Sequence, residues 1–376
     1  MIYLDSAATT LQKPPAVARA TAGAINRLAS PGRGGHRPAM EAADIAFACR
    51  EEAAALLRVD DPGRVVFTFN ATHGLNIAIK TLARPGARVV ISGYEHNAVT
   101  RPLHAIPGLD LRVARAPLFD RAGALEAFRQ ALDQGAELAV CNHVSNVFGF
   151  IQPLEEIAAL CRERGVPLIV DASQSAGVLP LDFEGLGAAF MAMPGHKGLY
   201  GPQGTGLLLC GTDPEPLLEG GTGSESIRQS MPDILPDRLE AGTHNVCGAV
   251  GLLEGMRFVS RMGTARIHRH EQKLTRRLMD RLERVPGVTV FRGNESCQSG
   301  LCSIVMKGMD CEEVGEALAK QGIAVRAGLH CAPLAHRSAG TQDIGTVRFS
   351  FSAFNRPDQA DRAAAALQTL AKREKY

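Results

Sequence analysis

A lysine in an unusual setting is the first residue of this sequence that points to chemistry. Lys197 lies in the run 194–202 (PGHKGLYGP), among small and apolar residues. Such neighbours exclude water from an ammonium group, which lowers its pKa and leaves a neutral amine able to form a Schiff base with an aldehyde. The alternative is an ordinary surface lysine, but surface lysines seldom stand between a histidine and several glycines. The run therefore predicts a lysine that bonds covalently to a carbonyl compound.

Two other motifs carry groups suited to a phosphorylated ligand. The run 70–76 (NATHGLN) opens an expected helix, where free backbone N–H groups and the Thr72 hydroxyl form a phosphate cradle, although a plain helix cap is as good an interpretation. Asp171, in the run 169–174 (IVDASQ), ends an expected strand at the sheet edge where α/β proteins bind ligands, although it also suits a helix cap. A phosphate cradle, an acid about a hundred residues later and a Schiff-base lysine are together the parts that pyridoxal phosphate requires.

A cysteine is the fourth candidate for chemistry. Cys331 lies in the run 322–333 (GIAVRAGLHCAP), in an expected loop five residues after Arg326. Taken alone, it is better interpreted as a buried, inert cysteine. The chain has nine cysteines and no close CxxC pair, which argues against a disulfide framework and against a zinc site.

The elements that must position these residues follow an α/β pattern. Short apolar runs alternate with segments of helical period, which predicts a seven-stranded, mostly parallel sheet with helices on both faces. The expected strands are 65–69, 88–92, 111–114, 138–141, 168–170, 189–193 and 206–209, and the expected helices are 74–82, 97–105, 123–134 and 153–164.

The pattern changes after residue 248, and a smaller α+β domain is expected there. We place the large domain at 15–255 and assign 1–14 and 256–376 to the smaller domain. The segment 211–240 has no clear period and is expected to be a long loop. The smaller domain is expected to contain helices 264–284 and 357–372 and strands 288–291, 302–306, 323–326 and 347–351.

Composition limits the partners of the chain. Its 376 residues carry 41 Lys+Arg and 39 Asp+Glu, a net charge of +2 with no long block of one sign, so no footprint for nucleic acid or an anionic membrane is present. No apolar run approaches the roughly 20 residues of a membrane helix, and the start of the chain lacks the pattern of a signal peptide. We therefore expect a cytoplasmic protein that acts on a small molecule.

These motifs together resemble the class V (fold type I) aminotransferase superfamily, and within it the SufS-like branch of the cysteine desulfurases, which also contains selenocysteine lyases. The resemblance runs from 3–10 (YLDSAATT) to 347–350 (VRFS), and its most specific pieces are 171–174 (DASQ), 195–197 (GHK) and 240–245 (EAGTHN). It implies the cofactor pyridoxal 5'-phosphate, the substrate L-cysteine or L-selenocysteine, a homodimer, and a sulfur-acceptor protein.

The resemblance also implies roles for individual residues. Lys197 would hold the cofactor, Asp171 would pair with its protonated ring nitrogen, and Cys331 would take the sulfur as a persulfide while alanine leaves. An open loop beside His330 and a cation-rich site are expected to favour the Cys331 thiolate. The other implied contacts are His96 stacked on the ring as a proton carrier, Gln174 at the phenolic oxygen, Thr72, His196 and the partner subunit's Thr243 at the phosphate, Asn146 on the substrate side, Arg326 or else Arg348 at the substrate carboxylate, and Arg33 and His36 at the entrance.

The sequence departs from the family pattern at a few positions. Pro194 stands where relatives usually carry Ser or Thr, which removes one hydroxyl contact to the phosphate, and Gly198 is an extra residue. His73 replaces a common Glu, and the loop 211–240 is shorter than its counterpart. The alternatives to a desulfurase are a selenocysteine lyase, an aminotransferase or epimerase of this fold, which would not need Cys331, and a non-catalytic protein that only binds the cofactor.

Overall fold

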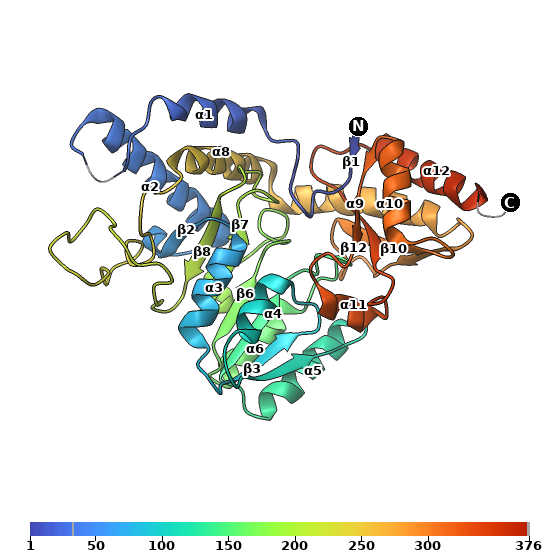
Figure 1. Cartoon of the computed structure of the whole chain (residues 1–376), viewed down its shortest axis with the longest axis horizontal. Coiled ribbons are helices and arrows are strands. Elements are labelled where there is room, and N and C mark those ends of the chain that lie inside the picture. The colour runs from blue at the N-terminus through green and yellow to red at the C-terminus, as the bar shows by residue number, and fades with distance from the viewer. Residues whose placement is uncertain (32–33, 374–376) are drawn as a thin grey trace.

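A seven-stranded sheet forms the centre of the computed structural model, which describes residues 1–31 and 34–373 (Figure 1). The strand order is β2-β8-β7-β6-β5-β3-β4. Strand β8 runs antiparallel to both of its neighbours, and the remaining neighbours pair in parallel, which confirms the mostly parallel sheet. The strands are β2 (Val65–Thr68), β3 (Arg88–Ser92), β4 (Asp110–Ala114), β5 (Leu138–Asn142), β6 (Leu168–Asp171), β7 (Phe190–Pro194) and β8 (Gly206–Cys210).

Both faces of this sheet are covered, which explains its continuous apolar strands. Every residue of β5, β6, β7 and β8 is buried. Successive side chains point to opposite faces, so Ile169 packs in one apolar cluster and Val170 in another. The helices between the strands are α3 (Ala71–Leu82), α4 (Asn97–His104), α5 (Arg121–Asp133), α6 (Leu154–Glu163) and the short α7 (Phe183–Leu186).

Three further helices lie together at the side of the sheet where Figure 1 draws the chain in blue and olive. They are α1 (Pro15–Ile25), α2 (Arg37–Leu57) and α8 (Val246–Met262), and α8 packs against the other two. A one-turn helix, η1 (Pro62–Arg64), precedes β2. The segment 211–240 contains no helix or strand, as expected.

The C-terminal part of the chain builds a second, antiparallel sheet with the order β12-β13-β10-β9 and its own apolar cluster. Helices α9 and α12 agree with the two expected helices of this region, and α10 and α11 are additional. The elements are α9 (Thr264–Leu282), β9 (Val288–Phe291), β10 (Leu301–Met306), α10 (Cys311–Lys320), β11 (Ile323–Ala324), β12 (Arg326–Gly328), α11 (Pro333–Ala339), β13 (Thr346–Ser350) and α12 (Pro357–Arg373).

The expected single strand 323–326 is wrong, because the chain changes sheets within it. Strand β11 pairs in parallel with the N-terminal strand β1 (Ile2–Tyr3), whereas β12 pairs with β13. The change buries Ile323 against β1 and leaves Arg326 exposed at the edge of the other sheet. The N-terminus is thereby joined to the C-terminal part of the chain, while the exact positions of the domain boundaries stay predictions.

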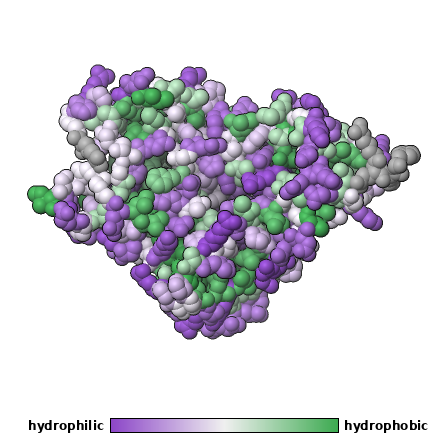
Figure 2. Space-filling view, in the orientation of Figure 1, coloured by the Kyte–Doolittle hydropathy of each residue, from purple (hydrophilic) through white to green (hydrophobic). Residues whose placement is uncertain are grey.

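Within 1–31 and 34–373, none of the helices is long and apolar enough to cross a bilayer. Figure 2 shows polar residues spread over the visible face with small apolar groups among them.

Candidate active site

Lys197 lies in a tight turn directly after β7. The turn is closed by two backbone hydrogen bonds, from Tyr200 N to Lys197 O at 3.0 Å and from Gly201 N to Gly195 O at 2.7 Å. A Cβ atom at Gly195 would collide with Thr205, and one at Gly198 with the carbonyl of Ala176. The glycines around Lys197 are therefore required by close packing.

The charge of Lys197 is set by burial and by its neighbours. Burial lowers the pKa of its ammonium group to about 8, and the positive charges of Arg348 and Arg326 also lower this pKa, while Asp171 and Asp5 oppose the shift. The lowered pKa expected from the sequence is confirmed, and a substantial fraction of the amine is neutral near pH 8.

Asp171 ends β6 with its side chain only 5% exposed. Its Oδ1 accepts a hydrogen bond from the backbone N–H of Ser173 at 2.9 Å, as a capping aspartate does. Its Oδ2 accepts none from the described residues. The carboxylate is thus fixed by one oxygen and leaves the other available to a ligand.

A cavity of about 100 Å³ brings most of the predicted residues together. Lys197 and Asp171 share it with side chains from α3, from the start of α4 and from the loop after β5. The predicted residues on its walls are Thr72, His96, Asn146, Asp171, Gln174, His196 and Lys197.

His96 enters the cavity as a neutral ring. It is the N-cap of α4, and its Nδ1 accepts a hydrogen bond from the backbone N–H of Ala98 at 3.0 Å, so the proton of the neutral ring is on Nε2. Burial lowers the pKa of His96 to about 4, and Lys197 adds to the effect while Asp171 opposes it. His96 is therefore a ring with one N–H donor and no net charge.

The start of α3 lies at one end of the cavity. The Asn70 side chain accepts from His73 N at 3.0 Å and caps the helix, while Ala71 and Thr72 line the cavity. The cap is therefore confirmed, whereas the phosphate cradle stays a prediction, for which the first N–H groups of the helix are available. His196 is near, and burial lowers its pKa to about 4.

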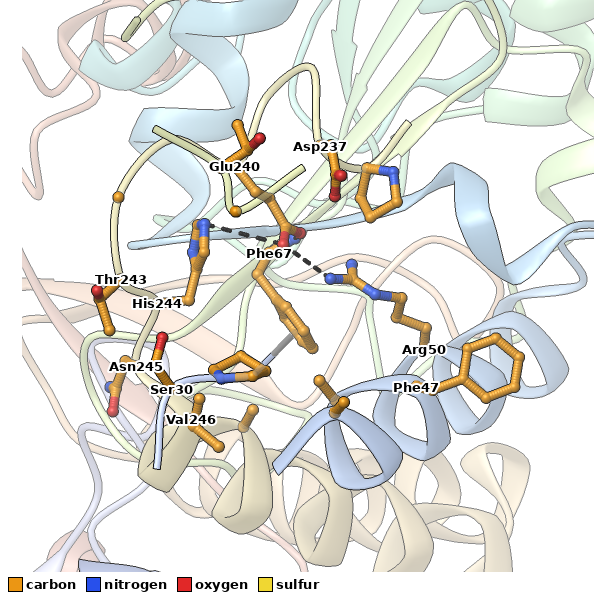
Figure 3. A pocket seen from close by; sticks show the side chains of 18 of the residues that line it. Ser30, Phe47, Arg50, Phe67, Asp237, Glu240, Thr243, His244, Asn245 and Val246 are labelled. Carbon is orange, nitrogen blue, oxygen red and sulfur yellow. Dashed lines mark hydrogen bonds and ion pairs between the residues drawn. The ribbon is translucent and has the colours of Figure 1, made fainter. Parts of the chain in front are cut away.

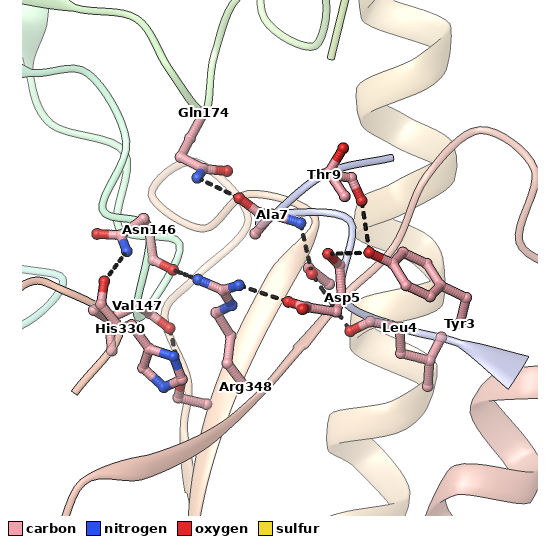
Figure 4. A network of polar contacts seen from close by, with 12 residues as sticks. Tyr3, Leu4, Asp5, Ala7, Thr9, Asn146, Val147, Gln174, His330 and Arg348 are labelled. Atoms are coloured by element: carbon pink, nitrogen blue, oxygen red, sulfur yellow. Dashed lines mark hydrogen bonds and ion pairs between the residues drawn. The ribbon is translucent and has the colours of Figure 1, made fainter. Parts of the chain in front are cut away.

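Asn146 and Arg348 form a buried network beside the cavity (Figure 4). Asn146 donates from Nδ2 to His330 O at 2.8 Å, and its Oδ1 is buried without a hydrogen bond among the described residues. Arg348, 1% exposed, donates to Asp5 Oδ1 at 2.7 Å and to Asn146 O at 2.8 Å. The Arg348 guanidinium is therefore held in place by the protein itself.

Arg326, the other predicted carboxylate ligand, is exposed and lies opposite Arg348 in the β12–β13 pair. Neither arginine lines the 100 Å³ cavity, but both are close enough to lower the pKa of Lys197 and of His96. The exposed guanidinium of Arg326 suits an anionic substrate group.

The N-terminal segment forms a wall of the site that the sequence analysis missed. Gln174 donates from Nε2 to Ala7 O at 3.0 Å, and Lys13 donates from Nζ to His196 O at 2.8 Å. The Nδ1 of His196 lies 3.1 Å from the Thr9 hydroxyl. The signal for this segment in the sequence is the run 3–10, which carries the family resemblance.

Cys331 is the one exposed cysteine of the nine. It lies between β12 and α11, where Cys331 and His330 both have left-handed backbones, with φ of 56° and 51°. The Cys331 carbonyl accepts a hydrogen bond from Asn97 N at 2.7 Å, next to His96. The loop is thus fixed beside the cavity, although Cys331 does not line it.

The His330 ring contributes no positive charge beside Cys331. His330 is buried, its Nε2 lies 3.1 Å from both oxygens of Thr346, and burial lowers its pKa to about 2. The ring is neutral and anchors the loop to β13. The ring is buried because Thr346 offers it hydrogen-bonding partners in the interior. Thr346 lies 16 residues further along the chain, so the local sequence around His330 gives no sign of this contact.

Thr243 is separate from the other predicted residues within one chain. It is exposed and lines a second cavity of about 370 Å³, shown in Figure 3, with His244, Phe47 and a buried pair of Arg50 and Glu240. Its contact with a partner subunit's cofactor stays a prediction. Of the two expected entrance residues, His36 is exposed before α2, and Arg33 lies outside the described residues.

The donor set of the 100 Å³ cavity fits pyridoxal 5'-phosphate. Asp171 Oδ2 is available to a protonated ring nitrogen, the Lys197 amine is partly neutral, and the start of α3 presents free N–H groups to a phosphate. The imidazole of His96 has the proton placement needed for donation from Nε2. The Asn146 Oδ1 adds a buried acceptor without a partner among the described residues.

Comparisons with known proteins show the family to which the whole chain is similar. Residues 2–363 match the model of the family described as aminotransferase class-V. A probable cysteine desulfurase from Methanothermobacter thermautotrophicus is 32% identical over 98% of this chain and 94% of the relative, and a cysteine desulfurase from Klebsiella pneumoniae is 33% identical over 99% and 94%. The solved apo structure of a cysteine desulfurase from Thermococcus onnurineus has a TM-score of 0.90 and 31% identity, and covers 99% of this chain and 94% of that one.

Proposed function

The chain belongs to the class-V aminotransferase family, and on this premise we propose that it is a pyridoxal phosphate-dependent cysteine desulfurase with Cys331 as its sulfur-accepting nucleophile. One observation carries the proposal: Lys197, Asp171 and His96 share a cavity, and the one exposed cysteine is held beside it through Asn97. Membership of the SufS-like branch stays a prediction.

The cofactor would be held by the walls of the cavity. Lys197 would bind its aldehyde, Asp171 its ring nitrogen, Gln174 its phenolic oxygen, and Thr72 with His196 its phosphate. When bound, pyridoxal phosphate supplies an electron sink for bonds at the substrate Cα.

The chain's own residues would bind the substrate and move its proton. Arg326 is the better candidate for the substrate carboxylate, because Arg348 is already paired with Asp5 and with the Asn146 carbonyl. With a pKa of about 8, the Lys197 amine can accept a proton at neutral pH and return it. The neutral His96 ring would donate a hydrogen bond from Nε2 to the substrate, and no proton would leave the ring.

The sulfur transfer balances without a further reactant. The Cys331 thiolate attacks the sulfur of L-cysteine, an S–S bond forms as the C–S bond breaks, and the electrons of the broken bond remain with the substrate carbon. That carbon takes up a proton and leaves as L-alanine, while Cys331 retains the sulfur as a persulfide. Its exposed loop supports a later transfer to an acceptor protein of unidentified class.

The oligomeric state and the location are parts of the same proposal. The exposed position of Thr243 supports a homodimer in which it reaches the partner's phosphate site. All nine cysteines are unpaired, which supports a reducing compartment, and so a cytoplasmic protein.

The proposal is tested by following alanine and persulfide in the presence of L-cysteine. Wild type is expected to release alanine and to carry a persulfide on Cys331. Cys331→Ser should still bind the cofactor and change its visible absorption with L-cysteine, yet release little alanine, because a serine hydroxyl is almost never ionised at neutral pH. The matched control is Cys247→Ser, at a half-buried cysteine of α8.

Wild-type alanine release by Cys331→Ser would contradict the persulfide mechanism. In that case the assay with L-selenocysteine decides between the alternatives. A selenocysteine lyase would release alanine and selenide, whereas a transaminase would move the amino group to a keto acid.

A further inference from the structure

A carboxyl group with no exposed surface lies directly before His96. The Glu95 side chain is surrounded by β3 and β5, and its Oε1 is 2.6 Å from the hydroxyl of Ser92 and 2.7 Å from the backbone N of Asn142. The same Ser92 hydroxyl lies 2.8 Å from Asn142 Oδ1. Asn142 in turn pairs with Asp171 across β5 and β6.

The number of hydrogens in this network determines the charge of Glu95. The Asn142 amide is oriented, because its Nδ2 donates to Tyr94 O at 2.9 Å, so its Oδ1 can only accept. The Ser92 hydroxyl has one hydrogen but lies between two acceptor oxygens if Glu95 is ionised, and one short O···O contact is then left without a hydrogen.

A proton on Glu95 Oε1 satisfies every contact. Oε1 then donates to Ser92 Oγ, the Ser92 hydroxyl donates to Asn142 Oδ1, and Asn142 N–H donates to Oε1. The other oxygen, Oε2, is buried without a hydrogen bond from the described residues, which is far less costly for a carbonyl oxygen than for a carboxylate.

The charged groups around Glu95 also favour its protonated form. The titratable groups that face it are Asp171 from β6 and Cys141 from β5, and neither is positive. Burial raises the pKa of Glu95 to about 8 and the negative charge of Asp171 adds to this shift, against the hydrogen bonds that Ser92 and Asn142 can donate to the ionised carboxylate. Burial also raises the pKa of the Cys141 thiol, and the adjacent His96 ring is neutral.

We propose that Glu95 is a positioning residue that acts as a neutral carboxylic acid, which fixes Asn142 beside Asp171 without placing a second negative charge there. A like charge at this position would favour protonation of Asp171 and weaken its pairing with a protonated ring nitrogen. That purpose rests on the proposed function, whereas the charge state of Glu95 does not.

The pH dependence of unfolding tests the charge state. The cofactor-loaded wild type and Glu95→Gln are unfolded in urea from pH 5 to pH 9. Between the usual glutamate pKa of 4.5 and about 8, the unfolded chain loses the proton and the folded chain keeps it, so wild-type stability falls with pH. The folded-to-unfolded ratio of wild type relative to Glu95→Gln should therefore drop up to roughly tenfold per pH unit over this range and level off above it.

The control is Glu126→Gln, at an exposed glutamate of α5, which should give a ratio that does not change with pH. If Glu95 had only a hydrogen-bonding role, Glu95→Gln would lower the folded-to-unfolded ratio by the same factor at every pH. That result would overturn the proposal, because it means that the folded protein holds Glu95 ionised across the range.

An infrared measurement keeps the proposal testable if Glu95→Gln does not fold. Wild type with ¹³C-labelled glutamate should show the carbonyl band of a protonated carboxyl at pH 6, and Ser92→Ala should shift it, because the acid loses its acceptor. The Ser92 variant is needed because Glu271 is also buried, with a raised pKa. A protonated band that Ser92→Ala leaves unmoved belongs to another residue and overturns the proposal. Neither measurement depends on turnover, so a chain that released no alanine would still report on Glu95.

Discussion

At the scale of single residues, two lysines compete for the role of cofactor ligand. Burial lowers the pKa of both Lys197 and Lys13 to about 8. The ammonium group of Lys13, however, donates hydrogen bonds to Thr10 Oγ1 and His196 O. Lys197 lines the cavity, and its ammonium group donates no hydrogen bond to the described residues.

We therefore predict that Lys197→Ala abolishes the visible absorption of the bound cofactor and all alanine release. Borohydride reduction of wild type followed by peptide mapping should place the pyridoxyl group on Lys197. The matched control Lys13→Met should retain that label. Recovery of the label on Lys13 would show that the site assignment is wrong.

The pH dependence of cofactor uptake follows from the same lysine. Only the neutral amine attacks an aldehyde, so uptake by cofactor-free protein should speed up as pH rises and level off above about pH 8. Asp171 raises the pKa of Lys197, so Asp171→Asn should move the midpoint to lower pH. The rate is measured by the growth of visible absorption, and equal midpoints in the two proteins would contradict this electrostatic coupling.

Residue types at the motifs were predictable from the sequence, but their partners were not. Lys197, Asp171 and Thr72 stand in runs whose spacing already indicates their environment. The pairing of Asp5 with Arg348 joins residues 343 positions apart, and no local pattern encodes such a contact. The buried direction of the His330 ring depends in the same way on Thr346 in a distant strand.

At the scale of elements, the loop that carries Cys331 is held in an unfavourable backbone conformation. A residue other than glycine in the left-handed conformation destabilises the folded state by about 1–2 kcal/mol. Glycine avoids this cost, but it loses more conformational entropy on folding. Cys331→Gly should therefore leave the free energy of unfolding equal or up to ~1 kcal/mol higher, while alanine release is lost.

The measurement is urea unfolding of wild type and Cys331→Gly at the same pH. Cys331→Val is the contrasting variant, because a β-branched side chain is poorly tolerated at positive φ, and it should lower stability. A loss of stability in Cys331→Gly larger than about 1 kcal/mol would mean that the thiol contributes to packing.

The central strands were predictable because every residue in them is buried, which gives a continuous apolar signal. Helices α1 and α2 were not found, because their buried faces consist largely of alanine and give little contrast with the exposed positions. The change of sheet after Ala324 was hidden for another reason. Both halves of 323–326 have strand-like residues, and only their partners differ.

At the scale of the whole molecule, a buried ion pair joins α2 to the loop before α8. Arg50 and Glu240 lie 2.8 Å apart with little exposure, and Glu240 also accepts from Phe67 N at 2.8 Å. Glu240→Ala should lower the free energy of unfolding by about 3–5 kcal/mol, because it leaves the Arg50 charge buried without its partner.

Urea unfolding provides the measurement for the ion pair as well. The control is Asp358→Ala, which breaks the exposed pair with Arg356 and should change stability far less than Glu240→Ala does, because water screens that pair. A similar effect of the two substitutions would show that Arg50 finds water or another partner.

The proposed homodimer makes a sharper prediction through mixed dimers. Lys197→Ala lacks the cofactor ligand, and Thr243→Asp would place a negative charge at the partner's phosphate. When the two proteins are mixed and allowed to exchange subunits, one site of the mixed dimer has both native residues, so activity should return. Sedimentation reports the dimer directly, and a fully active monomer would exclude shared sites.

Because Asp5 pairs with Arg348, one contact of the N-terminal segment can form only late in translation of the chain. These residues are separated by 343 positions, which a ribosome takes roughly 17–69 s to cover at 5–20 residues per second. In the later part of that interval the growing chain already contains Lys197 but lacks Arg348, which holds Asp5 beside the site. Premature termination before Arg348 therefore yields a chain in which Gln174 and His196 can still hold Ala7 and Lys13, while Asp5 lacks its charged partner.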